Sequence, residues 1–93
     1  MRIQWLPRAL VDLEQVGDYL RMQAPEVESR IVLQIYDSIG SLAEMPLRGR
    51  PMNRNGVRQL LLIDIQYVIT YRVLASSVQI LRIRHGARKP LKD

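Results

Sequence analysis

Arginines and a single histidine in the second half of the chain are the residues best suited to bind or act on an anion. They are Arg58, Arg72, Arg82, Arg84, His85 and Arg88. Arginine presents a fixed fork of donors to a phosphate or carboxylate, whereas histidine can give or take a proton near neutral pH. The set indicates either a surface for an anionic partner or a phosphate site with one acid–base group.

The charge of the chain is unevenly distributed. The net charge of the 93 residues is +5, but the part up to Pro46 holds four arginines against seven acidic residues, a balance of −3. From Leu47 onward ten basic residues face two acidic ones, a balance of +8. A field of that sign attracts phosphates or an acidic protein surface and speeds the encounter with either.

Two apolar runs predict the strands that carry these arginines. In the first run Tyr67, Ile69, Tyr71 and Val73 recur at every second position, so a strand places them on one face. After the break at residues 75–77, the run over residues 78–85 alternates apolar residues with Arg82 and Arg84 and predicts the second arm of an antiparallel hairpin. We expect Tyr71 in the core with its hydroxyl in water.

Earlier segments predict a short strand and two helices. Residues 2–6 alternate as a strand, and Pro7 is suited to the first position of a helix whose apolar stripe is Ala9, Leu13, Val16 and Leu20. On this helix we expect Asp12, Glu14, Gln15 and Asp18 to face away from the core. Pro25 opens a second helix with the stripe Val27, Ile31, Ile35, Ile39 and Leu42. The short connection predicts an antiparallel helix hairpin.

The remaining chain completes a two-layer α+β fold. Residues 46–56 are rich in Pro, Gly and Asn and predict an irregular loop, and residues 57–63 predict a further strand. The order is β-α-α-β-β-β, with the helix hairpin packed on one face of a mainly antiparallel sheet. The length fits one domain over residues 1–93. We expect the arginines to extend from the other sheet face. That face is either a ligand groove or a binding surface for a partner.

Composition excludes several classes of function. The chain has no Cys, which excludes disulfides, thiolate metal sites and cysteine nucleophiles. No signal peptide and no run of 18 apolar residues is present, so the expected location is the cytoplasm and no membrane contact is expected. Neither a metal nor a cofactor is expected.

Three C-terminal blocks carry a resemblance to a known family. Residues 42–60 (LAEMPLRGRPMNRNGVRQL), 67–73 (YVITYRV) and 80–88 (ILRIRHGAR) resemble the ParE branch of the RelE/ParE toxin superfamily. Pro7-Arg8-Ala9, Asp12-Leu13 and the break at Pro25 match as well.

The resemblance implies the toxin of a type II toxin–antitoxin pair. It also implies a cognate acidic antitoxin as partner, and it leaves open a homodimer or a toxin–antitoxin heterotetramer. Toxins of the ParE branch poison DNA gyrase and stabilise its cleaved DNA complex, whereas toxins of the RelE branch are metal-free, ribosome-dependent mRNA endonucleases. Because both branches share a fold, the residues on the sheet have to distinguish them.

The residues on the sheet favour the ParE branch. Val68 stands where RelE-like enzymes carry a phosphate-stabilising arginine, Gln59 and Leu61 stand where they carry lysines, and no aromatic residue follows Tyr71. We therefore expect a gyrase-binding toxin without catalytic residues. In the nuclease alternative the catalytic residues are His85, Arg88 and Arg58.

The residues expected to bind the target or the antitoxin are Arg58, Arg72, Arg82, Arg84, His85 and Arg88. Each also has a plain structural interpretation. Arginines on strands commonly just solvate an uncovered face, and a lone histidine at a strand end is more often a hydrogen-bonded structural group than a catalyst.

Overall fold

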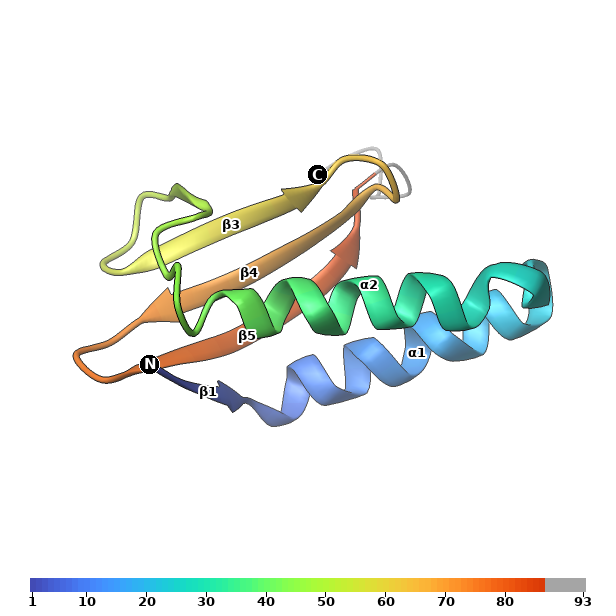
Figure 1. The fold of residues 1–93 in the computed structure, drawn as a ribbon, viewed down its shortest axis with the longest axis horizontal. Coiled ribbons are helices and arrows are strands. Elements are labelled where there is room, and N and C mark those ends of the chain that lie inside the picture. The colour runs from blue at the N-terminus through green and yellow to red at the C-terminus, as the bar shows by residue number, and fades with distance from the viewer. Residues whose placement is uncertain (87–93) are drawn as a thin grey trace.

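Two helices cover one face of a five-stranded sheet in the computed structural model, which describes residues 1–86 (Figure 1). The strands are β1 (Arg2–Trp5), β2 (Arg50–Pro51), β3 (Val57–Leu62), β4 (Tyr67–Val73) and β5 (Ser77–His85). They lie in the order β1-β5-β4-β3-β2, and every neighbouring pair is antiparallel except β1 with β5. The predicted α+β fold is confirmed.

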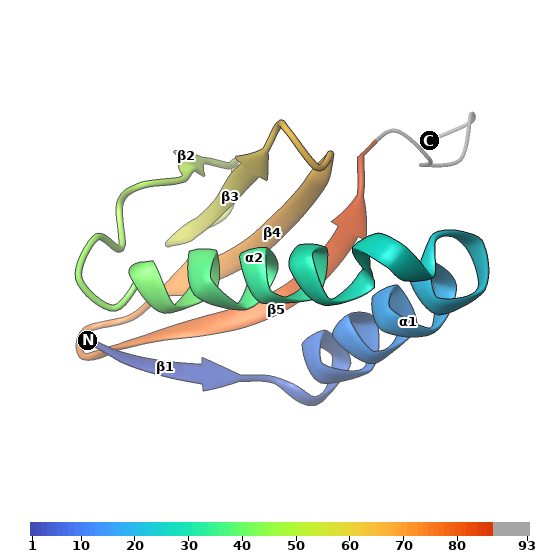
Figure 2. The same ribbon diagram turned by 45° about the vertical axis from the view of Figure 1, so that its right-hand side comes forward.

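Strand β2 is the element that the sequence did not predict. It lies within residues 46–56, which we expected to be irregular throughout, and it adds a short edge to the sheet beside β3 (Figure 2). A proline is tolerated at such an edge because no neighbouring strand needs its missing N–H.

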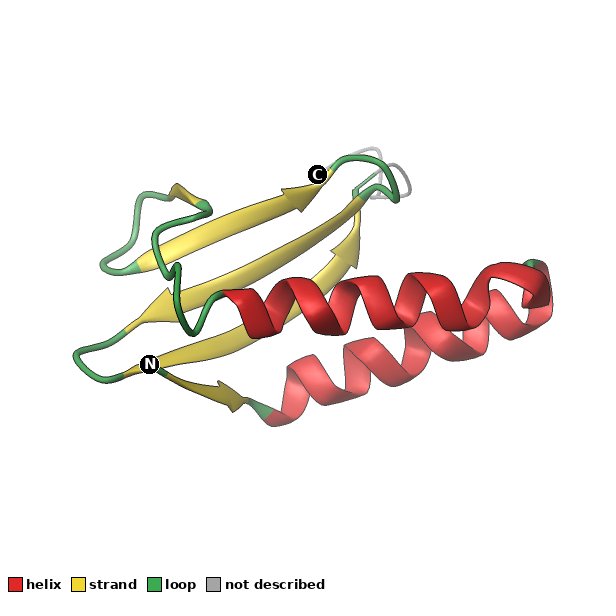
Figure 3. Ribbon diagram, viewed as in Figure 1, coloured by secondary structure: helices red, strands yellow, loops and turns green. Residues whose placement is uncertain are grey.

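The helix hairpin consists of α1 (Pro7–Gln23) and α2 (Glu28–Ser41), both on the same side of the sheet (Figure 3). Pro7 occupies the first turn of α1, as predicted. The prediction that Pro25 opens the second α-helix is wrong in detail, because residues Pro25–Val27 form a separate 3₁₀ turn, η1, before α2 begins. No helix within residues 1–86 is both long and apolar enough to cross a membrane.

The core lies between the hairpin and the sheet. Its fully buried side chains include Ile35 and Ile39 of α2, Ile69 and Tyr71 of β4, and Ile80 of β5. Ala9, Val16 and Leu20 of the stripe predicted for α1 are buried. The predicted alternation of β4 is confirmed, because Tyr67, Ile69 and Tyr71 face the helices while Val68 and Thr70 face the other way.

A β-bulge interrupts the alternation of β5. Thr70 pairs with Arg82 but Tyr71 pairs with Ile80, so Leu81 has no partner on β4. The extra residue allows Ile80 and Ile83 to face the core together, although they are three positions apart. The bulge thereby places Arg82 and Arg84 on the uncovered face of the sheet.

Helix α1 takes the place of a strand beside the second half of β5. Strand β1 ends at Trp5, which pairs with Ile80, and the chain then turns into α1, which runs past the rest of β5 (Figure 2). The outer edge of β5 after Ile80 therefore meets a helix. Side chains of α1 can reach the edge there.

Candidate functional site

A groove of about 790 Å³ lies on the sheet face away from the helices. Two rows of paired residues form its floor. The first row crosses four strands as Arg50, Gln59, Thr70 and Arg82, and the second crosses three as Leu61, Val68 and Arg84. Arg8, Asp12 and Gln15 of α1 form one wall, and Ile83, His85 and Gly86 complete the lining.

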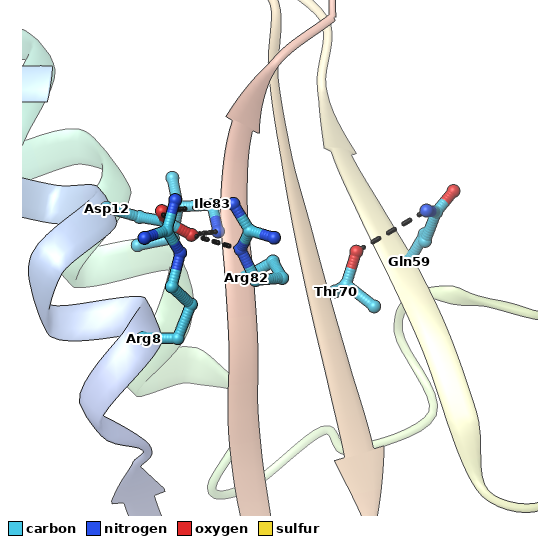
Figure 4. Close-up of polar contacts among 6 residues, drawn as sticks. All are labelled: Arg8, Asp12, Gln59, Thr70, Arg82 and Ile83. Carbon is cyan, nitrogen blue, oxygen red and sulfur yellow. Dashed lines mark hydrogen bonds and ion pairs between the residues drawn. The ribbon is translucent and has the colours of Figure 1, made fainter. Parts of the chain in front are cut away.

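The centre of the floor is polar but uncharged. Gln59 Nε2 donates a hydrogen bond to Thr70 Oγ1 at 3.4 Å (Figure 4). In the pairing of the strands both residues lie between Arg50 and Arg82. Gln59, Leu61 and Val68 are the three residues for which the sequence resemblance implies the nuclease positions of RelE-like enzymes. All three line the groove, so this floor offers no cation and no acid–base group at those positions.

Asp12 joins helix α1 to strand β5 at the wall of the groove. Its Oδ2 accepts hydrogen bonds from Arg82 Nε and from the backbone N–H of Ile83, both at 2.8 Å, and its Oδ1 lies 3.3 Å from Arg82 Nη2 (Figure 4). Arg8 Nε lies 3.3 Å from the same Oδ1. A buried carboxylate needs such partners, and the side chain of Asp12 is only 3% exposed.

The expectation that Asp12 faces solvent is therefore wrong. The physical reason is the short β1, which leaves the N–H of Ile83 at an open edge where Asp12 satisfies it. The i,i+4 spacing of Arg8 and Asp12 was a sequence signal for an ion pair, but that spacing carries no information about burial.

Two arginines of the groove make no ion pair with a residue in the range 1–86. Arg8 and Arg82 share the carboxylate of Asp12, so this trio contributes a net charge of +1. Arg50 and Arg84 are exposed, and neither makes an ion pair with any residue in the described range 1–86. They are the side chains most available to an anion.

Arg58 does not join the other arginines. It pairs with Tyr71 and lies on the helix-covered face, where its Nη1 donates to the carbonyl oxygens of Gly49 at 2.7 Å and Leu47 at 3.3 Å. The expected convergence of Arg58 with Arg72, Arg82 and Arg84 on one face is thus wrong for Arg58. Even and odd positions of β3 face opposite ways, and Arg58 falls on the other side from Gln59.

Tyr71 holds the loop that leads into the groove. Its hydroxyl donates to the carbonyl of Pro46 at 2.8 Å and accepts from the N–H of Gly49 at 2.7 Å, so it does not point into water as we expected. A Cβ at Gly49 would lie 2.7 Å from both this hydroxyl and the carbonyl of Gln59, which explains the glycine. This anchored segment runs directly into Arg50.

The other predicted residues are more scattered. Arg72 is on the uncovered face, in the row of Val57 and Gln79, but it lies outside the groove. His85 lines the end of the groove and packs edge-to-face against the ring of Tyr67, with ring centroids 4.9 Å apart. Arg88 lies outside the described residues.

Comparison with known proteins agrees with this architecture. The family described as "ParE toxin of type II toxin-antitoxin system, parDE" matches residues 3–90. A protein described as "Putative toxin Y4kP" from Sinorhizobium fredii is 39% identical over 85 residues, which is 91% of this chain and 88% of that protein. "Toxin RelE2" from Caulobacter vibrioides is 39% identical over 87 residues, covering 94% and 97% of the two chains.

A solved structure shows the same fold. A chain of the chromosomal ParDE toxin–antitoxin system from P. aeruginosa superimposes with a TM-score of 0.80 at 30% sequence identity, covering 91% of this chain and 95% of that one. Because the family match spans nearly the whole sequence and the relatives cover most of their own length, the chain belongs to the ParE toxin family of type II toxin–antitoxin systems, whose members are paired with a cognate antitoxin.

Proposed function

We propose that this toxin arrests growth by inhibiting DNA gyrase and stabilising its cleaved DNA complex. The observation that supports the proposal is the groove floor, where Gln59, Leu61 and Val68 occupy the positions at which a RelE-like nuclease needs cationic and proton-transferring side chains. A surface with arginines but few acid–base groups is suited to binding an anionic or acidic partner.

The chemical requirements of metal-free RNA cleavage also argue against a nuclease. Such a reaction needs a base for the ribose 2′-hydroxyl, a cation for the phosphate and an acid for the leaving oxygen within one cleft. Asp12 is engaged by Arg8, Arg82 and the N–H of Ile83. Within the described range His85 is the groove's other ionisable candidate for proton transfer, which leaves one of the two proton-transfer roles unfilled.

The experiment compares two targets with one preparation. Purified toxin should inhibit supercoiling by gyrase and accumulate cleaved DNA, while mRNA on translating ribosomes remains intact. Adding the cognate antitoxin should restore supercoiling, which controls for impurities. Codon-specific cuts in the mRNA without any effect on gyrase would reverse the proposal.

We propose that His85 and Arg88, at the end of β5 and in the residues that follow it in the sequence, contact the target. His85→Ala and Arg88→Ala should abolish growth arrest upon induction while the purified variants melt as the parent does. If both variants arrest growth fully, the gyrase contact lies elsewhere, and the exposed side of the helix hairpin around Asp18 is the next surface to test.

The second candidate is a RelE-like ribonuclease with a rearranged site. It is favoured by the 39% identity with a protein named Toxin RelE2 and by the presence of His85 among the residues that line the end of the groove. Under this function His85→Ala should eliminate mRNA cleavage in a translation reaction, with Arg58 and Arg88 as supporting cations. A parent protein that cuts no mRNA eliminates this candidate.

The antitoxin is proposed to bind across the arginine-bearing face and to add a strand at the edge of β3. Strand β2 pairs only with Arg58 and Gln59, so within residues 1–86 the edge from Leu60 onward has no neighbouring strand, and Ile63 beside it is 80% exposed. An unpaired apolar edge is a template for strand addition, and acidic side chains would complement the arginines.

A charge-matched pair of triple variants tests this docking. Replacing Arg72, Arg82 and Arg84 together by Ser should weaken antitoxin binding at physiological salt, and replacing Arg30, Arg48 and Arg54 by Ser should not. The first variant also loses the ion pair between Arg82 and buried Asp12. Its melting curve must therefore show that it remains folded before its binding is compared. If both triple variants bind equally well, the antitoxin docks mainly on the helices.

A further inference from the structure

The two groove arginines that make no ion pair within residues 1–86 stand at opposite sides of the groove. Arg50 is on β2 and Arg84 on β5, and β3 and β4 lie between them. Three strand spacings of about 4.8 Å separate the two strands by about 14 Å. The side chains between them are Gln59, Thr70, Leu61 and Val68, none of which is charged.

We infer that this groove binds the phosphodiester backbone of DNA, with Arg50 and Arg84 as its two phosphate contacts. The inference rests on the proposed function in one respect, because the DNA held by gyrase is the source of the ligand. It goes beyond that function by assigning a DNA contact to the toxin itself and by naming Arg50, which nothing in the sequence pattern singled out.

Asp12 determines which arginines of the groove are available to bind a phosphate. It holds the guanidinium of Arg82 through Nε and Nη2 and also pairs with Arg8, so these two form a fixed wall of the groove. Arg50 and Arg84 have no such carboxylate within residues 1–86 and can reorient toward a phosphate. Asp12 is therefore a positioning residue that leaves two free cations rather than four.

The lining favours the backbone of a nucleic acid over its bases. Among the described residues no Phe, Tyr or Trp lines the groove, so it offers none of the large aromatic platforms on which exposed bases stack. The Thr70 hydroxyl and the Gln59 amide provide further donors to phosphate oxygens midway between the arginines. Contacts of this kind position a nucleic acid without reading its sequence.

The spacing also suits a chain of regular charges. A DNA strand carries one phosphate for every 3.4 Å or so of helix axis, so a span of about 14 Å bridges several consecutive phosphates. Binding through two arginines should release about two counterions. The logarithm of the association constant should then fall with the logarithm of salt concentration with a slope of about −1.8.

The test measures binding of the full-length toxin to a short fluorescein-labelled duplex by anisotropy, without gyrase, between about 50 and 200 mM salt. The double variant R50Q/R84Q should bind at least about tenfold more weakly at the lowest salt and lose nearly all of the slope. Both arginines are exposed, so the melting temperature should stay unchanged.

The matched control is R30Q/R54Q, which removes the same charge from exposed arginines outside the groove. It should keep the parental affinity within about twofold and the parental slope. The inference is overturned if R50Q/R84Q binds like the parent, or if the control loses as much affinity, because net charge alone would then explain binding. It is also overturned if polyglutamate of equal charge competes as well as unlabelled duplex.

The DNA-binding test and the gyrase test can fail separately. A toxin that binds DNA through Arg50 and Arg84 but leaves supercoiling untouched supports the groove and rejects gyrase as the target. A toxin that inhibits gyrase but shows no DNA binding sensitive to these two residues rejects the groove and leaves the proposed function intact.

Discussion

The two faces of strand β4 are built from alternating residues of one seven-residue segment, yet they do different work. Tyr67, Ile69 and Tyr71 are almost entirely buried under the helices, whereas Val68 and Thr70 form part of an open groove floor. Burial of apolar side chains supplies most of the stability of a small domain, and exposed polar side chains supply little. Substitutions on the two faces should therefore separate folding from binding.

On each side of the sheet one polar side chain also holds a neighbouring segment in place by hydrogen bonds, and we call these two side chains tethers. On the covered side the Tyr71 hydroxyl holds residues 46–49, and at the groove wall Asp12 holds α1 against β5. Both tethers satisfy backbone groups that would otherwise be left without partners. They should rank between the core and the free arginines in their effect on stability.

The largest expected effect is in the centre of the covered face. Ile69→Ala should lower the free energy of unfolding by about 2–5 kcal/mol, because Ile69 is 0% exposed and a cavity would remain. Urea denaturation measures the loss. The control is Val68→Ala on the groove side of the same strand, for which we expect about 1 kcal/mol or less. Equal losses would contradict the division of work between the faces.

The next effect concerns the tether at the groove wall. Asp12→Ala should cost about 2–3 kcal/mol, since it leaves the N–H of Ile83 and the guanidinium of Arg82 without their acceptor. Asp18→Ala, six residues further along the helix, removes a carboxylate whose side chain is 65% exposed and should leave stability unchanged. If Asp12→Ala also leaves the free energy of unfolding unchanged, the carboxylate does not hold α1 to the sheet.

A smaller effect is expected at the loop tether. Tyr71→Phe keeps the buried ring but removes both bonds of the hydroxyl, so it should cost about 1–2 kcal/mol and speed hydrogen exchange at the amide of Gly49. Tyr36→Phe is the matched control, because its ring is exposed and can keep its stacking against Trp5. Unchanged exchange at Gly49 in the Tyr71 variant would show that the loop holds without the hydroxyl.

The smallest effect on stability is expected in the groove itself. Arg84→Gln should change the free energy of unfolding by less than about 0.5 kcal/mol, since the side chain is exposed and unpaired within residues 1–86. Its binding of labelled duplex should nevertheless weaken, and the salt slope should become shallower by about 0.9. A marked loss of stability would mean that Arg84 supports the fold instead of a ligand.

The sequence alone determined the order of the two helices and the four longer strands, the two-layer class and the covered face of β4, but it did not predict β2. These features depend on local periodicity, because apolar residues every second position face one side of a strand, and those at i, i+3 and i+4 face one side of a helix. Alternation along β5 also predicted Arg82 and Arg84 on the uncovered face, but the bulge at Leu81 is what keeps them there. The assignment of Gln59, Leu61 and Val68 to the nuclease positions came from the resemblance to the toxin superfamily and not from periodicity.

Only the tertiary structure decided which residues make the groove. Arg58 lies outside the groove because the register pairs it with Tyr71 on the covered face. Arg50 lines the groove because β2, which the sequence did not predict, pairs it with Gln59. Asp12 became buried because β1 ends early and leaves the edge of β5 to a helix. Register, edge occupancy and the bulge at Leu81 depend on partners far away in the chain, so local periodicity cannot reveal them.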